Sequence, residues 1–136
     1  MIKLIINADD FGMSKVFNEK ILELLKKGFI KSTTVMVNRI KRDQKSQIEQ
    51  LIELRKKGKI SIGLHLEFDT EKPIAPQIET QYQKFISIFG FPPSHLDIHR
   101  LIDSEEVIKE VNKFAEKNGI PVRNHGIKTS AKTTTE

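Results

Sequence analysis

The chain has 136 residues, of which 38% are hydrophobic and 30% are charged, and its net charge is +5. This length suits one domain with a substantial core and is short for two, so we expect residues 1–136 to form a single domain. The chain has no cysteine, which excludes disulfides, thiolate metal sites and cysteine nucleophiles. Any transition metal must therefore bind to His, Asp or Glu.

Charge and hydropathy also limit the partners. No apolar run approaches the roughly 20 residues that a membrane span needs. The apolar N-terminus is short and is followed by Asp9 and Asp10, so we expect no signal peptide and no membrane partner. We therefore expect a cytoplasmic protein. The lysines are scattered over predicted helix faces, without the aromatic-interleaved basic stretch of single-strand binders, which argues against a nucleic-acid partner.

The first part of the chain alternates strand and helix signals. Residues 3–8 are apolar and β-branched, which predicts a buried strand that ends in a turn over residues 9–12. A helix is expected from the N-cap Ser14 to a stop at Gly28, followed by a strand at 32–37. The expected apolar face of this helix consists of Phe17, Ile21, Leu24 and Leu25.

The same alternation continues to the end of the chain. The next expected elements are a helix at 43–57, a strand at 60–66, a helix at 77–89, a short strand at 95–98, a helix from Ser104 to Gly119 and a fifth strand that begins at Pro121. Strands that alternate with helices predict a parallel sheet, because each crossover carries a helix. An open doubly wound sheet and a piece of a (β/α) barrel both fit. In either fold the chemistry belongs at the carboxyl ends of the strands.

Polar side chains gather at three of these strand ends. They are Asn7, Asp9 and Asp10 after the first strand, His65 and Glu67 after the third, and His95, Asp97 and His99 on the fourth. Two adjacent carboxylates repel each other, and a divalent cation relieves that repulsion. One Asp and two His form the ligand set of a zinc-like site that keeps a position open for water. A helix-capping Asp pair and a core histidine explain single residues, whereas a metal site explains all three strand ends together.

Several segments resemble one family, in the order in which that family has them. They are NADDFG at 7–12, STTVMVN at 32–38, GLHL at 63–66, HLDIH at 95–99 and GIPVR at 119–123. Together they resemble the YdjC-like carbohydrate deacetylases, the chitooligosaccharide deacetylase type. The resemblance spans almost the whole chain, and NADDFG with a downstream GLHL is specific in combination.

The resemblance implies both a fold and a reaction. The fold would be α/β, with parallel βαβ units forming an incomplete, distorted (β/α) barrel-like sheet. The reaction would be removal of an N-acetyl group from an acetylated amino sugar or chitooligosaccharide by a metal-dependent hydrolase. A divalent metal, zinc or magnesium, would be held by Asp10, His65 and His99. Asp9 would be the general base that takes a proton from the attacking water.

The sequence also departs from this family. Relatives have further histidines where residues 100–103 stand here, and they carry a late His-Pro-Gly motif that supplies a proton to the leaving amine. His125 is the one candidate substitute for that acid. An inactive metal-binding remnant is therefore the alternative function. An incomplete barrel also leaves an open sheet edge, which a homodimer would cover.

A receiver-type phosphoacceptor domain is the rival from another class. It is also a parallel α/β domain of similar length with an acidic pair after its first strand. Asp69 would accept the phosphate and Lys128 would be the late lysine, with magnesium bound by the acidic pair. This interpretation leaves His65 and His99 without a role.

Overall fold

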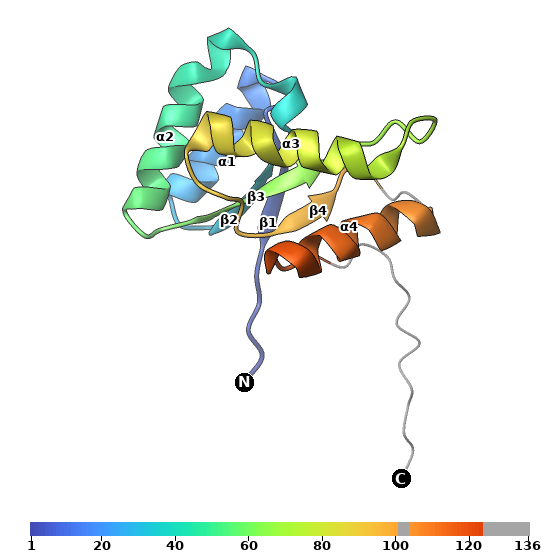
Figure 1. Cartoon of the computed structure of the whole chain (residues 1–136). Coiled ribbons are helices and arrows are strands. Elements are labelled where there is room, and N and C mark those ends of the chain that lie inside the picture. Colours follow the sequence, from blue (N-terminus) through green and yellow to red (C-terminus); the bar gives the residue numbers. More distant parts are fainter. Residues whose placement is uncertain (101–103, 124–136) are drawn as a thin grey trace.

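The computed structural model describes residues 1–100 and 104–123. Strands and α-helices alternate along this part of the chain (Figure 1). They are β1 (Asn7–Phe11), α1 (Lys15–Lys26), β2 (Ser32–Val35), α2 (Lys45–Lys56), β3 (Ser61–Leu66), α3 (Ile74–Phe89), β4 (Leu96–Ile98) and α4 (Glu105–Asn118), with short 3₁₀ helices η1 (Val37–Arg39) and η2 (Arg42–Gln44) between β2 and α2.

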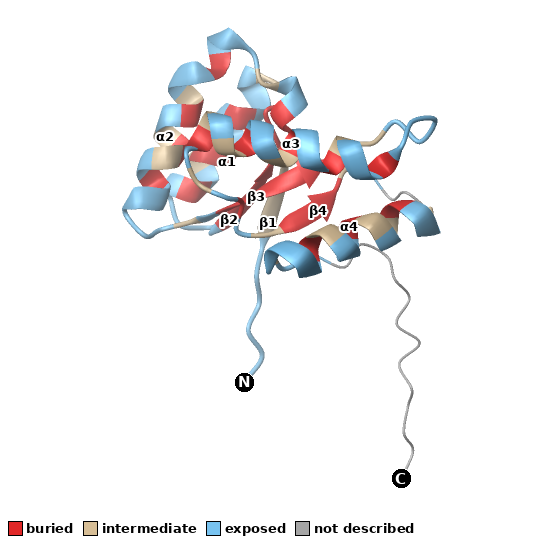
Figure 2. Cartoon of the chain, in the orientation of Figure 1, coloured by how far each residue is buried: buried red, intermediate tan, exposed pale blue. Residues whose placement is uncertain are grey.

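The four strands form one parallel sheet in the order β1-β2-β3-β4. Crossovers between neighbouring parallel strands are right-handed as a rule, and a run of them in the order β1-β2-β3-β4 places every helix on the same face of the sheet. The apolar strand residues and the inner faces of all four helices accordingly form one core cluster. Figure 2 shows these inner faces buried and the outer helix faces exposed. This is the arrangement of a (β/α) barrel rather than of a doubly wound sheet, and it confirms the predicted barrel-like α/β fold.

The opposite face of the sheet carries polar side chains. Side chains alternate along a strand, so Ile62, Leu64 and Leu66 point to the helices while Gly63 and His65 point away from them. Along β2 and β4, the side chains of Thr34 and Asp97 meet in a hydrogen bond although β3 lies between them. In a closed barrel this polar face would line the interior.

Local sequence signals explain the helix ends. The Ser14 hydroxyl accepts a hydrogen bond from the Phe17 amide, and the Ser104 hydroxyl accepts one from the Val107 amide, as the N-cap signals predict. Gly90 and Gly119 end α3 and α4 in the left-handed conformation that favours glycine.

The predicted apolar face of α1 is partly wrong. Phe17 and Leu24 are 50% and 40% exposed, whereas Asn18 and Leu22 are buried with Ile21 and Leu25. Asn18 can be buried because both polar atoms of its side chain have partners: Oδ1 accepts a hydrogen bond from the Gly12 amide and Nδ2 donates one to Gln47. A polar residue of α1 that contacts Gly12, after the end of β1, and Gln47 of α2 thus takes a place that hydropathy assigned to Phe17.

The first strand begins later than predicted. Residues 3–6 lie outside β1, and Leu4 and Ile5 are each 81% exposed. A strand needs a pairing partner, and the pairing between β1 and β2 begins only at Asn7, which lies opposite Ser32, the first residue of β2. The predicted turn at residues 9–12 is also wrong for Asp9, Asp10 and Phe11, which belong to β1.

Two further predictions concern the later strands. The fifth strand is represented by the bridge between Val122 and Leu96, with hydrogen bonds on both sides of Leu96, and residues 124–136 lie outside the described part. The receiver interpretation is wrong on topology, because receivers place the second strand at the sheet edge in the order 2-1-3-4-5. Lys128, its late lysine, is outside the described residues.

No helix in the described part of the chain is long and apolar enough to cross a membrane.

Candidate metal centre

A bulge in β1 brings two adjacent acidic side chains to the polar face. The pairing with β2 runs from Ala8↔Thr33 to Phe11↔Val35, so β1 has one extra residue between these pairs. Asp10 takes up this irregularity with a φ of 68°. In a regular strand, neighbours point to opposite faces. The bulge lets Asp9 and Asp10 both reach the polar face, and bulges commonly re-aim side chains in this way.

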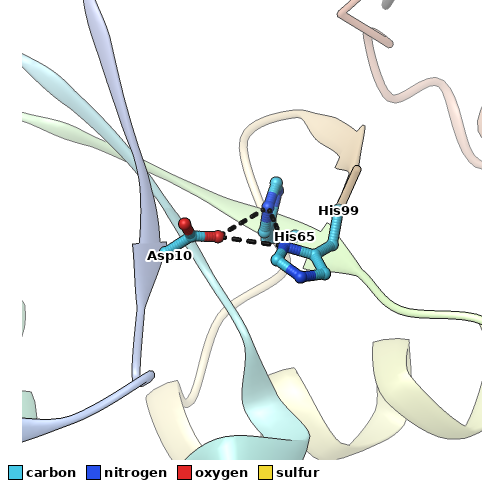
Figure 3. Close-up of side chains that lie close together, drawn as sticks. All are labelled: Asp10, His65 and His99. Carbon is cyan, nitrogen blue, oxygen red and sulfur yellow. Dashed lines mark hydrogen bonds and ion pairs between the residues drawn. The ribbon is translucent and has the colours of Figure 1, made fainter. Parts of the chain in front are cut away.

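Asp10, His65 and His99 converge at the carboxyl ends of β1, β3 and β4 (Figure 3). Asp10 Oδ1 lies 3.1 Å from His65 Nε2 and 3.1 Å from His99 Nδ1. The two imidazole nitrogens lie 3.2 Å apart. The three atoms therefore form a nearly equilateral triangle.

This triangle matches one face of a tetrahedral metal site. Ligands about 2.0–2.1 Å from a tetrahedral zinc ion are about 3.3–3.4 Å from one another. The observed separations of 3.1 and 3.2 Å are close to that edge. One carboxylate and two imidazoles are also a donor set that binds zinc and related divalent ions. The residues present therefore fit the divalent metal that the sequence resemblance implies.

The surroundings of His65 attract positive charge. Its ring is buried, and Nδ1 lies 2.5 Å from Asp97 Oδ1. Burial lowers the pKa of His65, but the hydrogen bond and charge of Asp97, with the charges of Asp9 and Asp10, outweigh it and raise the pKa above its ordinary value. The same carboxylates that stabilise a proton on His65 would stabilise a metal ion beside it.

Asp9 is held by a different set of contacts. Its Oδ1 accepts hydrogen bonds from Asn7 Nδ2 at 2.7 Å and from Arg123 Nη1 at 2.6 Å. Asn7 is itself fixed, because its Oδ1 accepts from the Ser32 hydroxyl at 2.6 Å. Within residues 1–100 and 104–123, no hydrogen bond engages the second oxygen, Oδ2. These contacts anchor one of the two oxygens of Asp9.

The structure thus brings together the three predicted ligands, with Asp9 next to Asp10 in the chain. The other candidates lie elsewhere. His95 contacts Asn7 and Ser94, and Glu67 pairs with Arg39 at 2.8 Å. Asp69 forms an exposed ion pair with Lys72. His125, the candidate acid, lies outside the described residues.

Sequence reasoning assigned no role to the residues that support the cluster. Asp97, Asn7 and Arg123 contact His65 or Asp9 directly. The alternation of HLDIH does indicate that Asp97 shares a face with His95 and His99. No local pattern indicates that Arg123, more than a hundred positions along the chain from Asp9, completes the site.

Comparison with known proteins shows the family of this chain. The family model for "YdjC-like protein" matches residues 3–79. The chain belongs to the YdjC-like family. Among curated relatives, the carbohydrate deacetylase of Clostridium beijerinckii is 31% identical, over 89% of this chain and 59% of its own length. The chitooligosaccharide deacetylase of Salmonella typhimurium is 30% identical, over 88% and 58%. This YdjC-like chain spans about three fifths of the relatives it matches.

Solved structures support the fold. A CE4 family pseudoenzyme from Bacillus anthracis matches with a TM-score of 0.63 at 12% identity, over 88% of this chain and 42% of the other. An acetyl xylan esterase from Clostridium thermocellum, in complex with cobalt, matches with a TM-score of 0.61 at 19% identity, over 79% and 54%. At these identities the likeness shows a shared fold, and this YdjC-like chain has the barrel-like α/β fold of CE4 deacetylases.

Proposed function

We propose that the chain is a metal-dependent hydrolase that removes acetyl groups from N-acetylated amino sugars, with chitooligosaccharides as the substrate class. The observation that carries this proposal is the triangle of Asp10 Oδ1, His65 Nε2 and His99 Nδ1, whose edges are 3.1, 3.1 and 3.2 Å. The relatives named carbohydrate and chitooligosaccharide deacetylase support the choice of substrate.

The residues divide the work between holding the cation and moving a proton. Asp10, His65 and His99 would hold a divalent ion, zinc or magnesium. When bound, that ion supplies electrostatic activation of the acetamide carbonyl and of the attacking water. Asp9, whose Oδ1 is anchored by Arg123 and Asn7, would accept the proton of that water.

The reaction balances with water as the only co-substrate. The water oxygen adds to the acetamide carbon and Asp9 takes one water proton. The leaving nitrogen gains one proton as the C–N bond breaks and Asp9 gives up its own, so the products are the free amine and acetic acid, which ionises to acetate. Two neighbouring carboxylates with separate contacts suit these roles, since Asp10 meets the imidazoles while Asp9 meets Arg123.

Zinc binding is the first test. Calorimetric titration of the metal-stripped protein is expected to show one tight equivalent. Asp10→Ala, His65→Ala and His99→Ala should each weaken it strongly, because each removes one of three ligand atoms. Asp69→Asn is the matched control, since Asp69 is an exposed carboxylate paired with Lys72. Histidine variants that bind zinc like wild type would refute the site.

Acetate release separates the enzyme from its alternative. An active enzyme should release acetate from N-acetylated chitooligosaccharides, and Asp9→Asn should abolish release while zinc still binds. The alternative, a metal-binding protein without turnover, binds zinc and releases no acetate. The match to a CE4 family pseudoenzyme is the observation that supports this alternative.

Two properties remain predictions of the sequence. One is a cytoplasmic location. The other is a homodimer, which the outer edge of β1 would favour, because β1 pairs only with β2 in the described part of the chain. A stable monomer in sedimentation at micromolar concentration would refute the dimer.

A further inference from the structure

A fully buried carboxylate lies beneath the metal centre. Asp97 sits in the middle of β4 with no exposed surface. Burying a charged carboxylate is costly unless hydrogen bonds and charges compensate it. Its neighbours Leu96 and Ile98 point into the core, so Asp97 faces the polar side, in register with His65 on β3. The contacts of Asp97 explain why a charged side chain occupies this buried position.

Both oxygens of Asp97 have defined partners. Oδ1 lies 2.5 Å from His65 Nδ1. Oδ2 accepts a hydrogen bond from the Thr34 hydroxyl at 3.0 Å and forms an ion pair with Arg123 at 3.5 Å. The shortest of these contacts, and the one that leads to the metal site, is the one to His65.

The contact with Asp97 determines which nitrogen of His65 carries the proton. Carboxylates, which only accept hydrogen bonds, face both ring nitrogens of His65: Asp97 Oδ1 lies 2.5 Å from Nδ1 and Asp10 Oδ1 lies 3.1 Å from Nε2. The contact with Asp97 is the shorter one, which favours the proton of a neutral His65 on Nδ1. Nε2 then presents a lone pair to Asp10 Oδ1 at 3.1 Å. Two electron-rich atoms at that distance repel each other unless a cation lies between them. The tautomer that Asp97 selects is therefore the one that can bind a metal.

We propose that Asp97 is a positioning residue that fixes the tautomer and ring orientation of His65, so that Nε2 faces the metal position. The consequence for metal affinity rests on the proposed function. The tautomer rests on the Asp97–His65 contact alone. The two parts can therefore be tested separately.

The tautomer is read by ¹⁵N NMR of the imidazole nitrogens of the full chain, without metal and at alkaline pH, where the rings are neutral. In wild type, His65 is expected to be protonated on Nδ1. In Asp97→Leu, which removes the acceptor while keeping similar bulk, the Nδ1–H form is expected to lose its dominance. A wild-type His65 protonated on Nε2, or an unchanged tautomer in Asp97→Leu, would overturn the proposal.

Zinc affinity gives the second readout. Asp97→Asn should weaken zinc binding by about 10- to 100-fold, the usual effect of losing such a partner of a ligating histidine. Asp69→Asn, an exposed carboxylate, should leave the affinity unchanged. Thr34→Val serves if Asp97→Leu does not fold, because it removes the hydroxyl that orients Oδ2, and it should weaken zinc binding in the same direction.

The outcomes distinguish the two proposals. Unchanged zinc affinity in both Asp97→Asn and Thr34→Val would refute positioning by Asp97. A wild-type protein that binds no zinc but shows the Nδ1–H tautomer would refute the proposed function and leave the assignment of Asp97 to His65 intact.

Discussion

The backbone conformation of Asp10 predicts that glycine is more stable than alanine at this position, which is the reverse of the usual order in a strand. In an ordinary strand, glycine is less stable than alanine by about 0.5–1 kcal/mol, because it loses more backbone freedom on folding. Asp10, however, has a φ of 68°, in the left-handed region that costs an L-residue about 1–2 kcal/mol. The difference leaves Asp10→Gly more stable than Asp10→Ala by about 0.5–1 kcal/mol.

Urea denaturation in the presence of a chelator measures this difference without a metal contribution. Both variants lack the carboxylate, so the loss of its contacts with His65 and His99 cancels between them. Ala8→Gly is the control in the same strand and should destabilise, since Ala8 is not among the residues with positive φ. The reasoning is refuted if Asp10→Ala is as stable as Asp10→Gly, or more stable.

Two further predictions concern the polar face. Gly63→Ala should destabilise the fold by about 1–3 kcal/mol in urea denaturation, because the added Cβ would lie 2.6 Å from the His95 ring and 2.7 Å from the His95 carbonyl oxygen. The control is Ser61→Ala, at the exposed start of β3, which should have little effect. Burial lowers the pKa of His95, and the charge of Arg123 lowers it further against the opposing charges of Asp97 and Asp9. The unfolded chain therefore takes up this proton at a higher pH than the folded one, so the contribution of His95 to stability is full above its unfolded pKa and is lost as the pH falls below it. In His95→Asn, the free energy of unfolding should no longer show the fall with decreasing pH that His95 causes. A pH profile identical to that of wild type would contradict the role given to His95.

Local patterns predicted most elements because the signals that set them are local. Ser14 and Ser104 cap their helices through hydroxyl contacts three residues away, and Gly119 ends α4. The exceptions depend on distant partners. Residues 3–6 have the composition of a strand, but pairing between β1 and β2 starts only at Asn7. Phe17 has the hydropathy of a core residue, but Asn18 is buried in its place through contacts with Gly12 and Gln47.

The sequence alone determined the absence of thiol chemistry, the alternation of strands and helices, and the gathering of carboxylates and imidazoles at the strand ends. The last two could be predicted because strand periodicity and the rule that ligands meet at the carboxyl ends of parallel strands depend only on residue order. The choice of Asp10, His65 and His99 as the predicted ligands came from the resemblance to the YdjC-like family. Tertiary structure alone decided that the strands run in the order β1-β2-β3-β4, and that a bulge with a positive φ turns Asp9 and Asp10 to one face. It also decided that Asp97 lies against His65 and Arg123 against Asp9, since contacts between strands far apart in sequence arise from packing.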